Sequence, residues 1–173
     1  MKSLFYILSA GIDSDFLDIS FIHKWSEELI VKAEKPKIWL IDLTLCSDSD
    51  SALDVLNNCV RHYGERLDEE YDRSLIGFLC LGLEKKLLSL DKFLSQVFDA
   101  VDPRLLAELK SDLHELYQLF ERDQSLSDEL QAAISSRFGA YRDESEQLYK
   151  YLIADDLYEK EKSMIEARHY LIA

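Results

Sequence analysis

Residues 75–83 have the sequence LIGFLCLGL, which contains no charged side chain. A helix is apolar on all sides only where other elements cover it on all sides, so this stretch predicts a buried central helix within about 69–88. Gly77 and Gly82 each weaken such a helix by about 1 kcal/mol, a cost that the close approach of a neighbouring helix would justify. The segment therefore predicts an all-α fold built around it.

Helical periodicity continues on both sides of this segment. Leucines recur at spacings of three and four between residues 105 and 116, which predicts a helix from Pro103 to about residue 122. Similar spacings predict helices over about 21–34, 52–63, 90–101 and 127–139, and one or two more in the last 30 residues. Ser20 and Ser51 are expected as N-caps and Gly139 as a helix end. We expect a compact bundle of about seven or eight helices.

Two segments near the N-terminus fit a strand as well as a helix. Residues 4–8 are apolar, and between 38 and 45 apolar residues alternate with Asp42 and Thr44. Pro36 suits the first turn of a short helix over 38–45, whereas the alternation suits a strand. A minor two-stranded element near the N-terminus stays open as an alternative.

The composition predicts one domain spanning residues 1–173. Only 5 Gly and 2 Pro occur, too few for a fold of many short strands and turns, and no linker separates the predicted helices. Cys46, Cys59 and Cys80 form no CxxC pair and lie among apolar residues, so we expect buried free thiols in a reducing compartment. No stretch approaches the roughly 18 apolar residues of a membrane span. These features predict a cytoplasmic protein.

The charge of the chain restricts its partners. It has 34 acidic and 20 basic residues, a formal net charge of −14 and a pI near 4.6. Such a surface repels the phosphates of nucleic acids and anionic membranes, so neither is an expected partner. A basic protein would be attracted. The alternative is that the acidity serves solubility alone.

Motifs that would indicate catalysis or cofactor binding do not occur in this sequence. It contains no glycine-rich phosphate loop, HExxH or GxSxG motif. Cys59 and His62 are one helical turn apart but have no second ligand pair, and the run from Asp48 to Ser51 lacks the central glycine of a calcium loop. We therefore expect no enzyme, metal or cofactor. A catalytic site assembled from distant residues, with His62 or His114 as its base, is the open alternative.

Half of the net charge is concentrated in one part of the chain. Residues 42–72 contain nine acidic residues and two arginines, a net charge of −7. Either this is a solvated surface with helix-capping acids, or it is a docking face with a tyrosine at its edge. The candidate partner-binding residues are Asp48, Asp50, Asp54, Glu65, Asp68, Glu69, Glu70, Asp72 and Tyr71.

One segment carries a family resemblance, over about residues 16–45. A helix, a proline and an aromatic-aliphatic run follow one another there, as Phe16-Leu17-Asp18, Ile22, Trp25, Glu28, Ile30, Pro36 and Trp39-Leu40-Ile41-Asp42-Leu43. This segment resembles small bacterial immunity proteins of toxin–immunity systems, and no functional residue can be carried over from them. The resemblance implies a protein that binds a toxin domain and blocks its active site. Such toxins are frequently basic nucleases, whose phosphate-rich substrate an acidic inhibitor mimics.

Charge and resemblance together favour one function over another. The favoured hypothesis is a non-catalytic inhibitor, an immunity protein or antitoxin, that neutralises a basic toxin domain such as a nuclease through its acidic face. The alternative is a structural or adaptor protein that associates through apolar helix faces. Those faces would lie around Phe93 and Phe98, or around Tyr149, Tyr151 and Tyr158.

Overall fold

The computed structural model describes residues 4–62, 69–100, 103–123 and 128–166, and this part of the chain is all-α. It contains nine helices, where seven or eight were expected, and no strand. The helices are α1 (Leu4–Asp13), α2 (Ile19–Lys32), α3 (Ile38–Leu45), α4 (Ser49–His62), α5 (Glu69–Glu84), α6 (Leu90–Ala100), α7 (Pro103–Asp123), α8 (Asp128–Leu152) and α9 (Leu157–Ile165).

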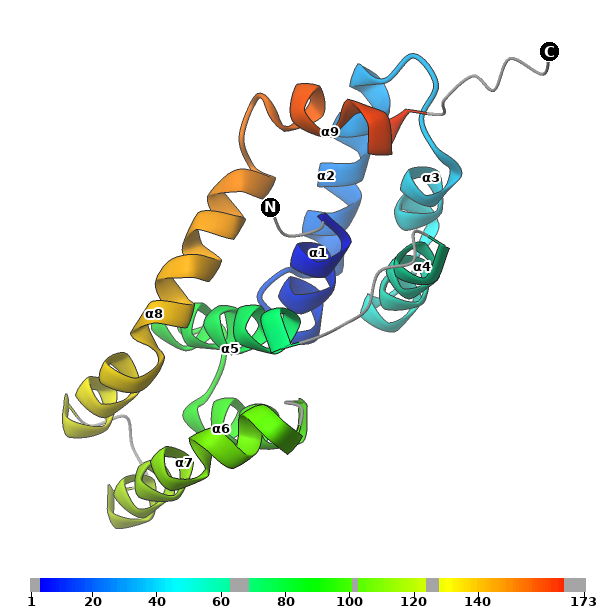
Figure 1. Cartoon of the computed structure of the whole chain (residues 1–173). Helices are drawn as coiled ribbons and strands as arrows, with labels where there is room; N and C mark the ends of the chain where they lie inside the picture. The colour runs from blue at the N-terminus through cyan, green and yellow to red at the C-terminus, as the bar shows by residue number, and fades with distance from the viewer. Residues whose placement is uncertain (1–3, 63–68, 101–102, 124–127, 167–173) are drawn as a thin grey trace.

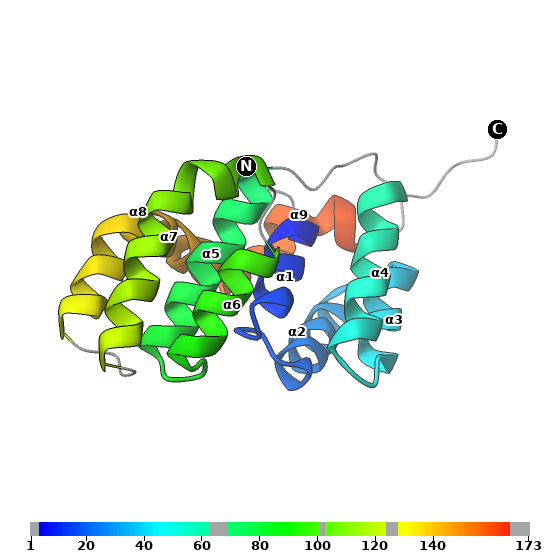
Figure 2. The same ribbon diagram turned by 90° about the horizontal axis from the view of Figure 1, so that it is seen from below.

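The helices are arranged from one end of the molecule to the other with α5 between two groups (Figures 1 and 2). On one side α3 packs on α2 and α4, and α4 packs on α1. On the other side α7 contacts both α6 and α8. Helix α5 contacts α1, α6 and above all α8, so it joins the two groups. Within α5, every residue from Ser74 to Leu83 is buried.

The alternative of two short N-terminal strands is wrong, because both segments are helical. Residues 4–8 lie in α1, whose side chains are buried over most of its length. Such a run fits a helix covered by neighbours, which satisfies its own backbone without a strand partner. In α3 the helical period of 3.6 buries Leu43 and exposes Ile41 and Leu45, although the three alternate with polar residues in the sequence.

Three predicted helix ends also differ from the structure. The carboxylate of Asp18 caps α2, accepting from the backbone N–H of Phe21 at 2.7 Å, in place of Ser20. Asp48 caps α4 by accepting from the N–H of Ser51 at 2.8 Å, so Ser51 is the partner of the cap and not the cap itself. Helix α8 continues through Gly139, because a glycine lowers helix propensity by only about 1 kcal/mol and packing on α5 and α7 outweighs that loss.

The crossing of α5 and α8 depends on Gly77. A Cβ atom at this position would overlap the backbone carbonyl of Tyr141 and the hydroxyl of Ser145. That hydroxyl is buried and donates a hydrogen bond of 3.0 Å to the carbonyl of Ser74, one turn before Gly77. The close helix approach expected at this glycine is therefore present. At Gly82 a Cβ would make only ordinary contact with Leu88, at 3.5 Å.

Two tryptophans connect distant parts of the chain. The indole N–H of Trp25 in α2 donates to the carbonyl of Leu152 at the end of α8, at 3.0 Å. The indole N–H of Trp39 in α3 donates to the carbonyl of Met164 in α9, at 3.2 Å, beside a backbone hydrogen bond of 2.8 Å from Lys37 to Ile165. Each bond joins residues more than a hundred positions apart in the sequence. The last two helices are thus held against α2 and α3.

Alanine substitutions at two glycines test the crossing. We expect Gly77→Ala to lower the free energy of unfolding by about 1–3 kcal/mol, because the added methyl group forces α5 and α8 apart. Gly139→Ala is the matched control within the same helix pair, and we expect it to raise stability by about 0.5–1 kcal/mol, since nothing lies within 4 Å of its Cβ. Urea unfolding followed by circular dichroism measures both. Equal effects at the two positions would contradict the close approach at Gly77.

Candidate protein-binding surface

Three of the predicted partner-binding carboxylates are exposed and close together in the fold. Asp48 precedes α4, while Asp50 and Asp54 lie one turn apart on its outer side. Asp42 is exposed on α3, which packs beside α4 (Figure 1). Among the described residues, no ion pair involves any of these four carboxylates. Their negative charge is therefore not neutralised within the described structure.

Two arginines of α8 are bound by acids of neighbouring helices. Arg137 bonds Asp112 and Glu115 of α7, and Arg142 bonds Glu84 of α5. These pairs stabilise the half of the molecule formed by α5, α7 and α8. The exposed carboxylates of α3 and α4 have no such ion-pair partner among the described residues, so their charge can act on molecules outside the protein.

An exposed apolar stripe lies on the same pair of helices. Ile38, Ile41 and Leu45 in α3 are 75%, 40% and 76% exposed. Their spacing of three and four places them on one face of the helix. Exposed aliphatic side chains that occur singly need no explanation, but three in a row along one helix face are a feature of binding surfaces. We call this stripe and the carboxylates of Asp42, Asp48, Asp50 and Asp54 the α3–α4 surface.

The sequence of residues 38–45 already predicts this stripe, provided that the segment is taken as a helix. If these residues are placed on a helical wheel, Trp39, Leu40 and Leu43 share one side, and the remaining aliphatic residues fall on the other. A short helix with large apolar residues on two opposite sides either buries both sides in the protein or uses one side to bind a partner. The stripe was therefore within reach of the sequence, once the segment was taken as a helix.

Four further predicted site residues lie wholly or partly outside the described residues. Glu65 and Asp68 fall within 63–68, which the structure does not describe. Glu69 and Glu70 form the first turn of α5, and their side chains are likewise outside the described part. Their part in a binding surface stays a prediction.

The last two predicted site residues are in the interior. Tyr71 and Asp72 are each only 6% exposed, so they are not available as an aromatic anchor and a steering charge at a surface. They begin the buried part of α5, where the helix meets α1. The sequence placed them with the acidic cluster because they follow Glu69 and Glu70 directly, but a helix turns neighbouring residues by about 100° and buries one side of the turn.

Tyr71 is engaged in a partly buried hydrogen bond between α1 and α5. Its hydroxyl donates to the carboxylate of Asp13. Burial raises the pKa of Asp13, an effect that the hydrogen bond from Tyr71 opposes and the nearby charges of Asp15 and Asp50 reinforce. Burial also raises the pKa of Tyr71, which keeps its phenol protonated as the donor. The pair connects the two helices at the end of the molecule where α4 begins.

The residues of the alternative hypotheses are scattered in the fold. Phe93 is fully buried and Tyr158 nearly so, while Phe98, Tyr149 and Tyr151 are half-buried in the core's margin, so none forms an exposed apolar face. The two candidate histidines lie on helices of different groups. His62 ends α4, and His114 lies on the exposed side of α7, where its ring bonds the amide of Gln118 at 2.9 Å.

The three cysteines are buried and form no disulfide, as expected. No three metal-binding side chains come together in the part of the chain that the structure describes. None of the described helices is both long and apolar enough to cross a membrane. Comparison with models of protein families, with curated proteins and with solved structures finds no match to this chain.

The Asp13–Tyr71 pair predicts how stability depends on pH. Because the folded pKa of Asp13 is raised, its contribution to stability is fully present below the ordinary value of 3.8 and is lost as the pH rises through the folded pKa. Asp13→Asn keeps an acceptor for Tyr71 and removes the titration. We expect the variant to gain stability relative to the wild type as the pH rises.

The measurement is the urea midpoint of both proteins at several pH values between acid and neutral. Asp42→Asn, which removes an exposed carboxylate of α3, is the control. A difference in stability between Asp13→Asn and the wild type that is the same at every pH would contradict the raised pKa of Asp13.

Proposed function

We propose that this chain is a non-catalytic protein-binding inhibitor that takes a basic partner on the α3–α4 surface. The observation that carries the proposal is the exposed stripe of Ile38, Ile41 and Leu45 on α3, a helix that packs on α4, together with exposed carboxylates on both helices that form no ion pair among the described residues. An apolar centre with a charged border is the arrangement by which proteins combine affinity with selective attraction.

Each half of this surface has its own physical role. The aliphatic stripe loses contact with water on binding, which contributes about 25 cal/mol for each Å² of apolar surface buried. The carboxylates act at longer range, because they attract a basic partner before contact and repel acidic competitors. Binding should therefore depend on the stripe for its lifetime and on the carboxylates for its rate of association.

Within this class we propose an immunity protein or antitoxin, with a basic toxin domain as its partner. The excess of negative charge supports a cationic partner. The resemblance of residues 16–45 to immunity proteins supports the same class, and this segment includes α2 and the exposed stripe of α3. The buried cysteines, which form no disulfide, support action in a reducing cytoplasm.

A structural or adaptor role is the second candidate, and the exposed stripe favours it too. A second copy of the chain is the partner in that case. Two acidic surfaces repel each other, so such association would become stronger as salt screens the carboxylates, whereas salt weakens the attraction of a basic partner.

Two variants test the halves of the surface separately. In the first, Ile38, Ile41 and Leu45 all become serine. In the second, Asp50→Lys and Asp54→Lys reverse two charges, and Asp48 is left in place because it caps α4. The matched controls are Leu87→Ser, an aliphatic residue 61% exposed beyond α5, and the pair Asp155→Lys with Glu159→Lys, which has the same spacing and charge change at α9.

The probe is the protein encoded next to this chain's gene, tested for binding by surface plasmon resonance at low and high salt. We expect the serine variant to dissociate at least about tenfold faster and the lysine variant to associate about tenfold more slowly at low salt, with a weaker salt dependence. The controls should behave as the wild type, and co-expression of the wild type should relieve toxicity of the probe. Binding that is equal in all variants would show that the α3–α4 surface is not the binding site. Self-association that salt strengthens, detected by sedimentation, would favour the adaptor.

A further inference from the structure

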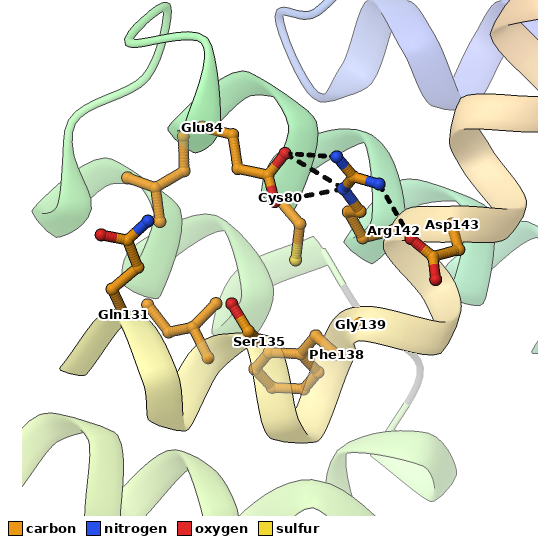
Figure 3. Close-up of a pocket in the computed structure, with 10 residues that line it drawn as sticks. Cys80, Glu84, Gln131, Ser135, Phe138, Gly139, Arg142 and Asp143 are labelled. Atoms are coloured by element: carbon orange, nitrogen blue, oxygen red, sulfur yellow. Dashed lines mark hydrogen bonds and ion pairs between the residues drawn. The ribbon is translucent and has the colours of Figure 1, made fainter. Parts of the chain in front are cut away.

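A cavity of about 300 Å³ opens between α5 and α8, on helices that take no part in the α3–α4 surface. Figure 3 shows its lining side chains on these two helices. Its floor is formed by Cys80, Leu83, Ile134 and Phe138, all of them buried. A volume of this size is at the lower end of the range for small-molecule sites. It holds one ring with a short chain.

A glycine in the middle of α8, Gly139, lines the cavity. Nothing lies within 4 Å of the position that a Cβ would occupy there. Any larger side chain would project into this open space and would also strengthen the helix. Unlike Gly77, therefore, Gly139 is not required by the packing of α5 against α8. Its lack of a side chain leaves room at the cavity.

Arg142 is the one cation among the residues that line the cavity, and its guanidinium is already bound by carboxylates. The guanidinium of Arg142 donates to Glu84 through Nε at 3.0 and 3.1 Å and through Nη2 at 2.9 Å. Its Nη1 donates to Asp143 at 2.8 Å and to Glu146 at 3.2 Å. An anionic ligand would have to displace one of these carboxylates to reach the guanidinium.

The carboxylates at the rim, in contrast, have acceptor capacity left. Three of them surround the single guanidinium, and the only other cation in the network described is Lys150, which binds Glu146 and is not among the residues that line the cavity. The network is thus net negative, and Asp143 is exposed with one oxygen outside the bond to Arg142. A carboxylate accepts through two oxygens, so it can bind a second cation without releasing the first.

Cys80 gives the floor a neutral character. Burial raises the pKa of this thiol, so it is not a thiolate at neutral pH. A buried thiol of this kind behaves as a small apolar group and not as a nucleophile. The cavity thus combines an uncharged floor with a negative rim, a combination suited to binding and not to covalent chemistry.

We propose that the α5–α8 cavity binds a small hydrophobic cation, with an aromatic or aliphatic body on the floor of Cys80 and Phe138 and a protonated amine against the carboxylates of Glu84 and Asp143. Charge distinguishes this ligand from an anion of the same body. The inference does not rest on the proposed function, because the two sites use different helices.

The test uses two probes with the same body and opposite charge, 4-phenylbutylamine and 4-phenylbutyrate. Binding to the full chain is followed by the backbone amide signals of an NMR titration at about 0.15 M salt, where long-range effects of the net charge are screened. We expect saturable shifts for residues 80–84 and 131–143 with the amine, and at least about tenfold weaker binding of the carboxylate.

Two variants show whether the cavity is responsible. Gly139→Leu fills the space with a good helix former, so the fold should be retained and amine binding should be lost. Asp143→Asn should weaken the amine several-fold and leave the carboxylate no weaker, whereas Glu27→Gln, an exposed acid of α2, should change neither. Carboxylate binding as strong as amine binding, amine binding that survives Gly139→Leu, or no saturable binding of the amine would each overturn the proposal.

Discussion

The contact between α5 and α8 at Gly77 is the constraint on which the rest of the structure depends. The absence of a side chain there lets the carbonyl of Tyr141 and the hydroxyl of Ser145 lie against the α5 backbone. Ser145 is fully buried, and its hydrogen bond to Ser74 fixes the register of the two helices. Helix α5 also packs on α1 and α6, so this register places the α1–α4 group relative to α6 and α7. A shift of one helix would therefore be felt at both ends of the molecule.

The sequence predicted the fold class and most helices because their apolar residues follow the helical period over long stretches. Helix α7 is the clearest case, with Leu109, Leu113 and Leu116 buried on one side. The sequence identifies Gly77 as a candidate for close packing, because a glycine weakens a helix and the close approach of a neighbouring helix would justify that cost. The hydrogen bonds of Trp25 and Trp39 were beyond such reasoning, because they join residues over a hundred positions apart and depend on the tertiary arrangement.

The candidate site was less predictable than the fold, and charge explains why. Net charge over residues 42–72 identifies a segment rich in carboxylates, but it does not distinguish an exposed carboxylate from a buried one. Asp50 and Asp54 face solvent, whereas Asp72 lies in the interior of the same acidic cluster. Exposed and buried acids differ only in the side of the helix on which the side chain lies. For Asp72, the residue at which α5 begins determines that side. The stripe on α3 was missed because residues 38–45 fit a strand as well as a helix, and only a helix places Ile38, Ile41 and Leu45 together on one face.

Both proposed sites follow from how the chain distributes its few cations. Arg137 and Arg142 are enclosed by carboxylates of α5, α7 and α8, which stabilises those helices and leaves the cavity rim with carboxylates in excess over guanidinium. Asp50 and Asp54 take part in no ion pair among the described residues, so they keep their field. A carboxylate in an ion pair holds a helix in place, and one without a partner acts on molecules outside the protein. Under both proposals the α5–α8 cavity selects a small cation at short range, while the α3–α4 surface attracts a large one from a distance.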